Sequence, residues 1–295
     1  MEELDRLLEF CKEAYNQRPC EEDKSKCSGN KRCETKCSAN CDGCLQDIHN
    51  RSNSKLDYAC EYQTYFYVMK FFYRYASEIG IVLHENLQDL LPKDQVNIVS
   101  IGCGPSSELY GFLAFLIANG KDGNINYWGF DVNSTWTTVQ HKNQNILSRF
   151  SVIYSDNDGF DFIRNHKEID LLILNYILSD LTRRNDSSAI AGFISRLEEI
   201  IRDKQVRYIL INDIYLTYST RTAYAIMKDF VRFCFNNGIR KEDIVRYQFK
   251  EPNQFQTRFG ATPRNKEIIF KRNIALTEID PWLDLGSMGV VIKVK

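Results

Sequence analysis

The 295-residue sequence lacks long apolar runs, an excess of one charge and any internal repeat. No stretch approaches the roughly 20 apolar residues that a helix needs to cross a membrane, and the acidic, amphipathic N-terminus is unlike a signal peptide. A formal net charge of −1 provides no global field that would steer the protein toward nucleic acid. These absences predict a cytoplasmic protein that has no membrane partner.

The sequence does contain enough apolar residues for a globular fold. Hydrophobic residues make up 43% of the chain and aromatic residues 13%. A chain of this length can bury one large core, or one core together with a small module. The distribution of cysteines and apolar runs divides the chain into a cysteine-rich N-terminal module, residues 1–60, and a larger domain, residues 61–295.

The most informative segment is residues 96–136. A short apolar run ends in Gly102-Cys103-Gly104, a helical pattern follows, and a second apolar run ends in Asp131. This order of strand, glycine turn, helix, strand and acid is one half of a nucleotide-binding Rossmann unit. Gly102 and Gly104 permit positive φ and lack the Cβ atoms that would block a ligand. Asp131 is expected to accept hydrogen bonds from ribose hydroxyls, so the segment predicts a nucleoside site.

The stretches IGCGPSSELYGF and YWGFDVNSTW resemble motifs I and II of the class I S-adenosylmethionine-dependent methyltransferases. The turn lacks the third glycine of a dinucleotide site, and no phosphate-cradling lysine follows it. The sequence departs from that family at Ser100, where an acid is frequent, and at Pro105-Ser106, which replaces the last glycine. The resemblance covers about residues 90–272 and implies an enzyme that uses S-adenosylmethionine. An accidental glycine turn in another α/β protein is the alternative.

Apolar runs place the other elements of the larger domain. We predict strands at 150–154, 169–174 and 206–211, helices around 188–202 and 220–236, and a late antiparallel pair at 243–249 and 267–271. The fold class expected is α/β, with a doubly wound, mostly parallel seven-stranded sheet. The aromatic-rich segment 62–79 is expected to be a leading helix, on which Tyr65, Tyr73 and Arg74 either line the pocket or pack in the core.

Polar side chains recur where the predicted strands end, at the edge where open α/β sheets bind ligands. The resemblance implies that an acid after the third strand contacts adenine, which points to Asp156 first and Asp158 second. It also implies that Asn175 and Tyr176 contact the acceptor, although the tetrad here is N-Y-I-L and not N-P-P-Y. Methyl transfer from a sulfonium needs mainly positioning of the acceptor. Asp180 or Asp213 is a candidate base for a weak nucleophile, with helix capping as the alternative.

The resemblance therefore implies two sets of site residues. The predicted cofactor-binding residues are Ser100, Gly102, Cys103, Gly104, Glu108, Asp131, Asp156 and Asn175. The predicted catalytic residues are Asn175, Tyr176 and Asp180.

Seven of the ten cysteines lie within residues 11–44. Such a cluster favours a metal site in a reducing compartment, and Cys41-Asp-Gly-Cys44 is typical of a zinc knuckle in which Gly43 turns amide groups toward sulfur. The candidate metal ligands are Cys33, Cys37, Cys41, Cys44, His49 and Cys60. The spacing of Cys37, Cys41 and Cys44 also matches the iron–sulfur motif of radical S-adenosylmethionine enzymes, although no barrel pattern follows. Thiols without metal and disulfides are further alternatives, and the module is a candidate surface for a protein partner.

Basic and aromatic residues alternate late in the chain. The basic residues are Arg240, Lys241, Arg246, Lys250, Arg258, Arg264, Lys266, Lys271 and Arg272, and the aromatic ones are Tyr247, Phe249, Phe255 and Phe259. On a hairpin beside the site they are expected to track phosphates and stack on bases. The favoured function is methyl transfer to RNA or another nucleic acid. The alternatives are a protein or small-molecule acceptor, an inactive methyltransferase-like binding or assembly factor, and a different nucleotide-dependent enzyme.

Overall fold

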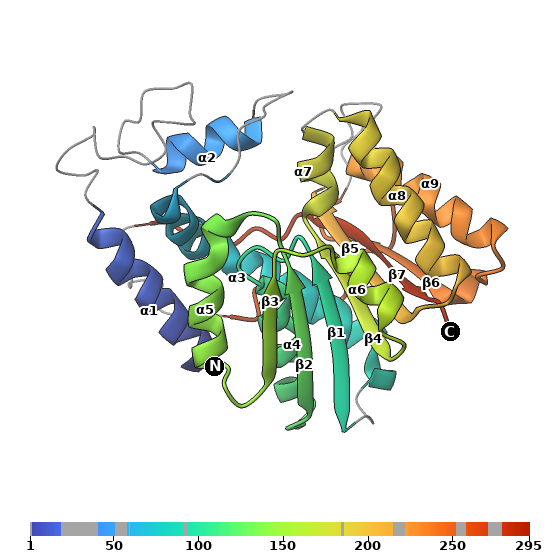
Figure 1. Cartoon of the computed structure of the whole chain (residues 1–295), viewed down its shortest axis with the longest axis horizontal. Helices are drawn as coiled ribbons and strands as arrows, with labels where there is room; N and C mark the ends of the chain where they lie inside the picture. The colour runs from blue at the N-terminus through green and yellow to red at the C-terminus, as the bar shows by residue number, and fades with distance from the viewer. Residues whose placement is uncertain are drawn as a thin grey trace.

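A seven-stranded sheet forms the centre of the protein (Figure 1). The computed structural model describes residues 2–18, 41–50, 58, 60–90, 94–183, 186–214, 222–251, 258–270 and 279–295. The strands are β1 (Gln95–Ile101), β2 (Asn124–Phe130), β3 (Ser151–Ser155), β4 (Ile169–Asn175), β5 (Val206–Ile214), β6 (Ile244–Gln248) and β7 (Ser287–Lys293). Their order is β3-β2-β1-β4-β5-β7-β6, and β7 runs in the direction opposite to the other six strands of this sheet. The predicted α/β fold with a mostly parallel seven-stranded sheet is confirmed.

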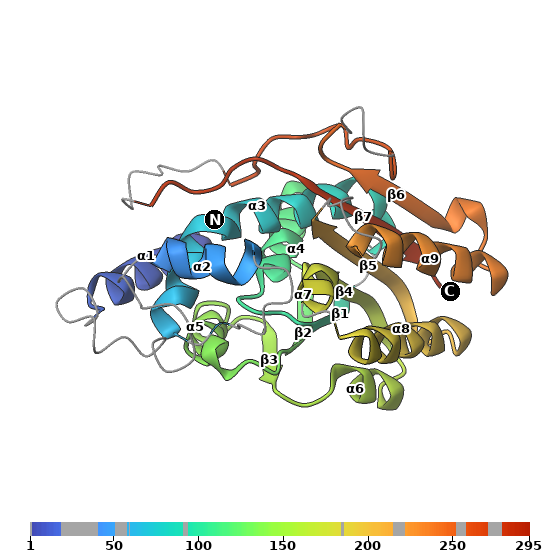
Figure 2. The same cartoon turned by 90° about the horizontal axis from the view of Figure 1, so that it is seen from above.

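Helices cover both faces of the sheet (Figure 2). One face packs against α1 (Glu2–Asn16), α3 (Glu61–Asn86), α4 (Ser107–Ala118) and α5 (Thr137–Ile146). The other packs against α6 (Gly159–Asn165), α8 (Ser187–Arg202) and α9 (Ala223–Asn236). Two more helices, α2 (Cys41–Asn50) and α7 (Ile177–Arg183), lie at the edge where the parallel strands end (Figure 1). Single 3₁₀ turns occupy Gln88–Leu90, Ser134–Trp136 and Lys241–Asp243.

The central strands are buried on both faces, which explains why their sequences are apolar without alternation. In β4 the first six residues are all buried. Along it, Leu171 and Ile173 contribute to the cluster under α3 and α4, whereas Leu172 and Leu174 contribute to the cluster under α6, α8 and α9. The sheet therefore separates two hydrophobic cores.

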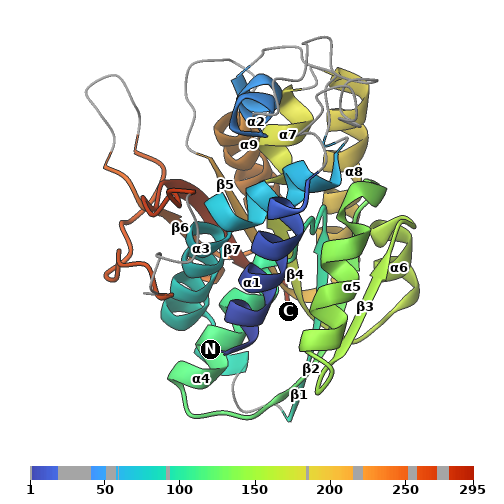
Figure 3. The same ribbon diagram turned by 90° about the vertical axis from the view of Figure 1, so that its left-hand side faces the viewer.

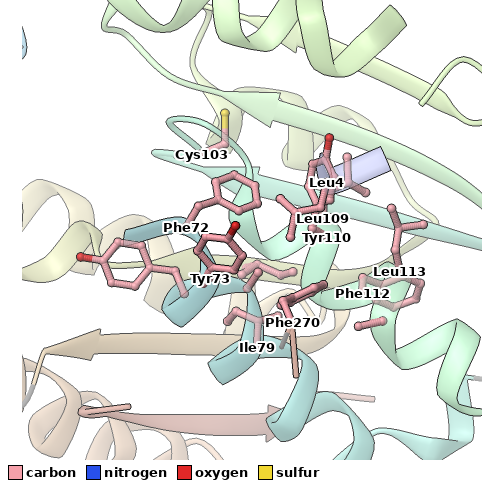
Figure 4. Packing of buried hydrophobic residues seen from close by; sticks show 14 of the residues in the cluster. Leu4, Phe72, Tyr73, Ile79, Cys103, Leu109, Tyr110, Phe112, Leu113 and Phe270 are labelled. Carbon is pink, nitrogen blue, oxygen red and sulfur yellow. The ribbon is translucent and has the colours of Figure 1, made fainter. Parts of the chain in front are cut away.

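The predicted leading helix is confirmed as α3, which packs mainly against α4. Figure 4 shows Phe72 and Ile79 of α3 among Leu109 and Tyr110 of α4, and the rings of Phe72 and Tyr110 meet edge to face at 5.1 Å. A Cβ atom at Gly111 would lie 2.6 Å from the carbonyl oxygen of Ala76. This glycine therefore allows the two helices to approach closely.

The described parts of residues 1–60 share the core of the larger domain. Leu4, Leu7 and Cys11 of α1, and Leu45 and Ile48 of α2, belong to the same buried cluster as α3 and α4. Figure 3 shows α1 lying beside α3, in agreement with their contacts. The domain boundary at residue 60 stays a prediction.

No helix within the described ranges is long and apolar enough to span a membrane.

One predicted strand is wrong. The partner of β6 is β7, Ser287–Lys293, and not residues 267–271. The apolar run at 267–270 packs against α3: the amide of Ile269 donates to Ser77 Oγ at 3.1 Å, and Phe270 is buried in the cluster beneath that helix. In β7, a Cβ atom at Gly289 would lie 2.2 Å from the Ile211 carbonyl oxygen, so only glycine fits between β5 and β6.

Candidate functional site

The glycine turn after β1 has the backbone that the sequence predicts. Gly102 has φ +68° and Gly104 has φ +47°, both in the left-handed region. The turn is fixed to the end of β2, because the Gly102 amide donates to the Phe130 carbonyl oxygen at 2.7 Å. The space that a Cβ atom of Gly102 would fill is taken by Ile177, whose Cδ1 lies 2.5 Å from that position. In this structure Gly102 therefore makes room for the first residue of α7.

Asp131 joins the glycine turn to the end of β2. Its Oδ2 accepts from the Gly104 amide at 2.8 Å, and its Oδ1 accepts from the Asn133 amide at 2.9 Å. The side chain is half-buried, while the next residue, Val132, is 80% exposed. Carboxylate and exposed apolar side chain thus form a corner at the carboxyl end of β2, where a nucleoside is expected.

A residue that the sequence did not indicate packs against this corner. The carbonyl oxygen of Tyr58 accepts from Asn133 Nδ2 and from Thr135 Oγ1, each at 2.9 Å. The Tyr58 ring lies 5.0 Å from that of Trp136, and the indole of Trp136 lies 3.6 Å from where a Gly104 Cβ would be. The chain just before α3 therefore supports the loop that follows Asp131.

The two acids after β3 have different surroundings. Asp156 is exposed at the end of the strand. Asp158 is the N-cap of α6, where Oδ1 accepts from the Phe160 amide at 2.9 Å, and it pairs with Arg196. Asp158 thus serves as a helix cap and ion-pair partner, while its side chain, like that of Asp156, is exposed.

Three other predicted cofactor residues lie beneath the turn rather than on its surface. Ser100, Cys103 and Glu108 are all buried. Glu108 Oε1 accepts from the Tyr127 hydroxyl at 2.6 Å. Burial raises the pKa of Glu108, and the hydrogen bond from Tyr127 opposes that rise. Burial also raises the pKa of the Cys103 thiol, so this thiol is held in its neutral form.

Asn175 and Tyr176 follow β4 and are both hydrogen-bonded inside the protein. Asn175 Nδ2 donates to Ser107 Oγ at 3.2 Å, and its Oδ1 accepts from Asn212 Nδ2 at 2.9 Å. Tyr176 has φ +60°, a left-handed backbone that costs a non-glycine residue about 1–3 kcal/mol. Its ring packs against Tyr75 with centroids 4.1 Å apart. The strain at Tyr176 therefore has to be offset by the contacts of its side chain.

Those contacts centre on Glu78 of α3, which no sequence signal marked. Glu78 Oε2 accepts from the Tyr176 hydroxyl at 2.8 Å and from Asn212 Nδ2 at 3.2 Å. Glu78 Oε1 accepts from Arg74 Nε at 3.0 Å and from the amides of Gly286 and Ser287 at 2.9 and 3.1 Å. Arg74 in turn donates to the Tyr176 hydroxyl oxygen at 2.9 Å. One buried carboxylate thus joins α3, β4, β5 and the start of β7.

The two candidate bases differ in burial. Asp213, at the end of β5, is fully buried and accepts from the amides of Ser179 and Ile214 at 3.0 and 2.7 Å. Burial raises the pKa of Asp213 to about 6. Asp180 is half-buried and pairs with Arg183 at 2.7 Å. Asp213 is therefore a carboxyl group that changes charge close to neutral pH.

The described part of the cysteine-rich segment contains no metal site. Cys41 and Cys60 are buried, and Cys44 is half-buried. Cys41-Asp-Gly-Cys44 forms the first turn of helix α2, and its role as a zinc knuckle stays a prediction. Among the described residues no three potential ligands come together. Cys33, Cys37 and the His49 side chain lie outside the described residues, so a zinc or iron–sulfur site stays a prediction, which elemental analysis of the purified protein tests.

The predicted base-stacking aromatics are buried. Tyr247, Phe249 and Phe259 all lie in the hydrophobic clusters and have no face available to a nucleic acid, which corrects that prediction. Phe255, Lys271 and Arg272 lie outside the described residues.

Several basic side chains of the same region are paired with acids. Arg240 pairs with Asp243 and Glu242, Arg258 with Glu251, and Lys250 with Asp284. The local positive charge is therefore smaller than the count of basic residues indicates.

Comparisons with known proteins give distant structural likenesses. The chain matches no family model and no curated protein sequence. Among solved structures it is similar to the delta-N METTL16 MTase domain, with 10% identity, 74% of this chain and 83% of that chain covered, and a TM-score of 0.42. It is also similar to an rRNA methylase from Streptococcus thermophilus, with 13% identity, 72% of this chain and 94% of that chain covered, and a TM-score of 0.40. A third similar structure is a SAM dependent methyltransferase from Archaeoglobus fulgidus, with 17% identity, 72% of this chain and 94% of that chain covered, and a TM-score of 0.36.

Proposed function

We propose that this protein transfers a methyl group from S-adenosylmethionine to an acceptor, with RNA or another nucleic acid as the favoured acceptor class. The observation that carries the proposal is the hydrogen bond between Asp131 and the Gly104 amide. It joins a left-handed glycine turn after β1 to an acid after β2, at the carboxyl edge of a mostly parallel sheet, and this is where such sheets bind nucleosides.

The residues at this edge fit the nucleoside half of the cofactor. A carboxylate has about four acceptor positions, so the Asp131 carboxylate is the type of group that binds both backbone amides and ribose hydroxyls. The exposed Val132 provides an apolar surface for adenine, and the exposed Asp156 is one strand further along the edge. Where the amino-acid end of the cofactor is expected, Ile177 lies over Gly102. The Ile177 atom that occupies this space is the terminal carbon of a flexible side chain. Binding there requires Ile177 to rotate.

When bound, the cofactor supplies an electrophilic methyl group on a sulfonium. The task of the protein is to hold the acceptor atom in line with that methyl group at roughly 3 Å. Asn175 and Tyr176 are the residues we assign to the acceptor side, with Asn175 closest to the glycine turn through Ser107. In this assignment the ring and the strained backbone of Tyr176 shape the site, because its hydroxyl is engaged by Glu78 and Arg74.

Thermal unfolding with and without cofactor tests the nucleoside site. S-adenosylmethionine or S-adenosylhomocysteine at 100 times its dissociation constant should stabilise the protein by about 2.7 kcal/mol, and NAD should not. Asp131→Ala should abolish the response. Asp122→Ala is the matched control, because Asp122 is an exposed acid just before the other end of β2. A full response in Asp131→Ala would refute the ribose assignment.

The alternative of an inactive binding factor has one observation in its favour, namely that Ile177 occupies the space over Gly102. Radiolabelled methyl transfer into fractionated cell extract separates the possibilities. Label in RNA or DNA supports the favoured acceptor, and label in protein or in small molecules identifies another one. Cofactor binding without any labelled product would indicate the inactive factor.

A further inference from the structure

We propose that Trp282 is the residue on which an unpaired acceptor base stacks, a proposal that rests on the proposed function and narrows it to single-stranded nucleic acid. The indole is 45% exposed and stands between the buried residues Pro281 and Leu285. The exposed aromatic side chains among the described residues are Trp282 and Phe235. Phe235 lies in the last turn of α9, on the other face of the sheet.

The topology of the sheet brings Trp282 to the acceptor side of the site. Because β7 runs antiparallel, it begins where β5 ends, with Ser287 paired to Ile214. Residues 279–286 therefore approach the sheet at the edge that carries Asn175 and Tyr176. Figure 2 shows this segment running along α3 before it enters β7.

Contacts with α3 hold Trp282 in place, which a side chain needs if a base is to stack on it. Its amide donates to the Lys70 carbonyl oxygen at 2.7 Å, and its ring lies 5.9 Å from that of Phe71. A few residues later, the amides of Gly286 and Ser287 are held by Glu78. The segment is thus fixed at both ends of its exposed part.

The guanidinium of Arg74 connects the indole to the acceptor position. It lies 5.4 Å from the Trp282 ring centroid and also donates to the Tyr176 hydroxyl oxygen. Arg74 is only 5% exposed, so its cation covers the inner side of the indole and the exposed part of the ring faces solvent. A planar base fits that surface, and since a base must leave its duplex partner to stack on a side chain, the substrate is single-stranded or locally opened.

The charges nearby indicate stacking rather than phosphate contact as the main source of affinity. Lys250 is paired with Asp284 beside Trp282, and Lys70 is paired with Asp42. Each phosphate neutralised by a protein cation adds roughly 0.7 to the slope of log K against log salt for single strands. We therefore expect a small slope, about 1 or less in magnitude.

The test is fluorescence anisotropy with a labelled eight-nucleotide oligoadenylate. Trp282→Ala should weaken binding about tenfold, because a base–aromatic stack of ordinary strength corresponds to a factor of that size. Trp282→Phe should retain most of the affinity, and Phe235→Ala, which removes an exposed ring elsewhere, should change nothing. A duplex of the same sequence should bind more weakly than the single strand.

Several outcomes would overturn the proposal: wild-type affinity in Trp282→Ala, equal binding of duplex and single strand, or methyl transfer to protein without oligonucleotide binding. The cofactor response separates this proposal from the proposed function. Trp282→Ala should keep its full stabilisation by S-adenosylmethionine. If the wild-type protein shows no such stabilisation but binds the oligonucleotide through Trp282, the proposed function fails and the stacking site stands.

Discussion

Replacing Glu78 by alanine should lower the free energy of unfolding by about 3–5 kcal/mol, because it removes one partner of a buried ion pair. The Glu78 carboxylate accepts from five donors, and without it the Arg74 guanidinium stays buried with its charge uncompensated. The amides of Gly286 and Ser287 also lose their acceptor, and an unsatisfied buried donor adds about 1–3 kcal/mol on its own. Urea denaturation followed by circular dichroism measures the loss.

Glu85→Ala is the matched control for this variant. Glu85 lies on the same helix and also accepts from two backbone amides, those of Arg264 and Asn265 at 2.7 and 3.2 Å, but it is exposed. Its removal should cost about 1 kcal/mol or less, since water replaces the lost acceptor. The double variant Arg74→Met with Glu78→Leu should be more stable than Glu78→Ala, because it removes both charges. A loss in Glu78→Ala no larger than in Glu85→Ala would contradict the role of the buried carboxylate.

The strands that the sequence predicted best are those buried on both faces. Residues 169–174 and 206–211 became β4 (Ile169–Asn175) and β5 (Val206–Ile214), because a long apolar run fits few other environments. The run at 267–271 was assigned to the wrong element. Its apolar side chains pack beneath a helix, and a short apolar run does not distinguish that environment from a strand. The true partner, β7, contains Gly289, which weakens a strand pattern.

The candidate site was predictable to the extent that its residues follow strands. Strand order brings Gly104, Asp131, Asn175 and Asp213 to one edge of the sheet, and each lies at the end of an apolar run. Glu78 was not predictable in this way. It contacts Tyr176, Asn212 and Gly286 across 98, 134 and 208 residues of sequence. Nothing local to an aromatic-rich helix specifies such contacts, which depend on how α3 packs against the finished sheet.

The predicted nucleic-acid contacts show that the exposure of a surface side chain also depends on tertiary packing and not on local sequence alone. The alternation of basic and aromatic residues at 240–272 suggested side chains exposed together. In the structure the aromatic members that are described turn inward, and Trp282 beyond the end of that segment is the exposed ring. Composition pointed to residues 240–272, whereas the exposed ring lies outside them, and its exposure depends on how residues 279–286 pack against α3.

Stability should fall as the pH rises through the range in which Asp213 ionises. Burial raises the pKa of Asp213 from 3.8 to about 6 in the folded protein. The folded state therefore holds this proton more tightly than the unfolded chain does, and between about pH 4 and 6 unfolding releases it. By linkage, the contribution of Asp213 to stability is fully present below pH 4 and is lost as the pH passes 6.

The expected size of this effect is about 3 kcal/mol, because one pKa unit corresponds to about 1.36 kcal/mol. The measurement is the difference in unfolding free energy between the wild-type protein and Asp213→Asn at pH 4, 5, 6 and 7. Taking this difference cancels the contributions that other titrating groups make to the pH dependence. Glu108 is one such group, because burial raises its pKa as well. Relative to Asp213→Asn, the wild-type protein should lose about 2 kcal/mol of that amount between pH 4 and pH 7, because at pH 4 the carboxyl group of the unfolded chain is already more than half ionised.

Asn175→Ala provides the control, since Asn175 lies at the end of the neighbouring strand and does not titrate. Its difference from the wild-type protein should be the same at every pH. If the Asp213→Asn difference were equally flat, Asp213 would keep an ordinary pKa in the folded protein, because the hydrogen bonds from the amides of Ser179 and Ile214 would offset the effect of burial. In that case the carboxylate would be ionised at neutral pH, and the proposed rise in its pKa would be refuted.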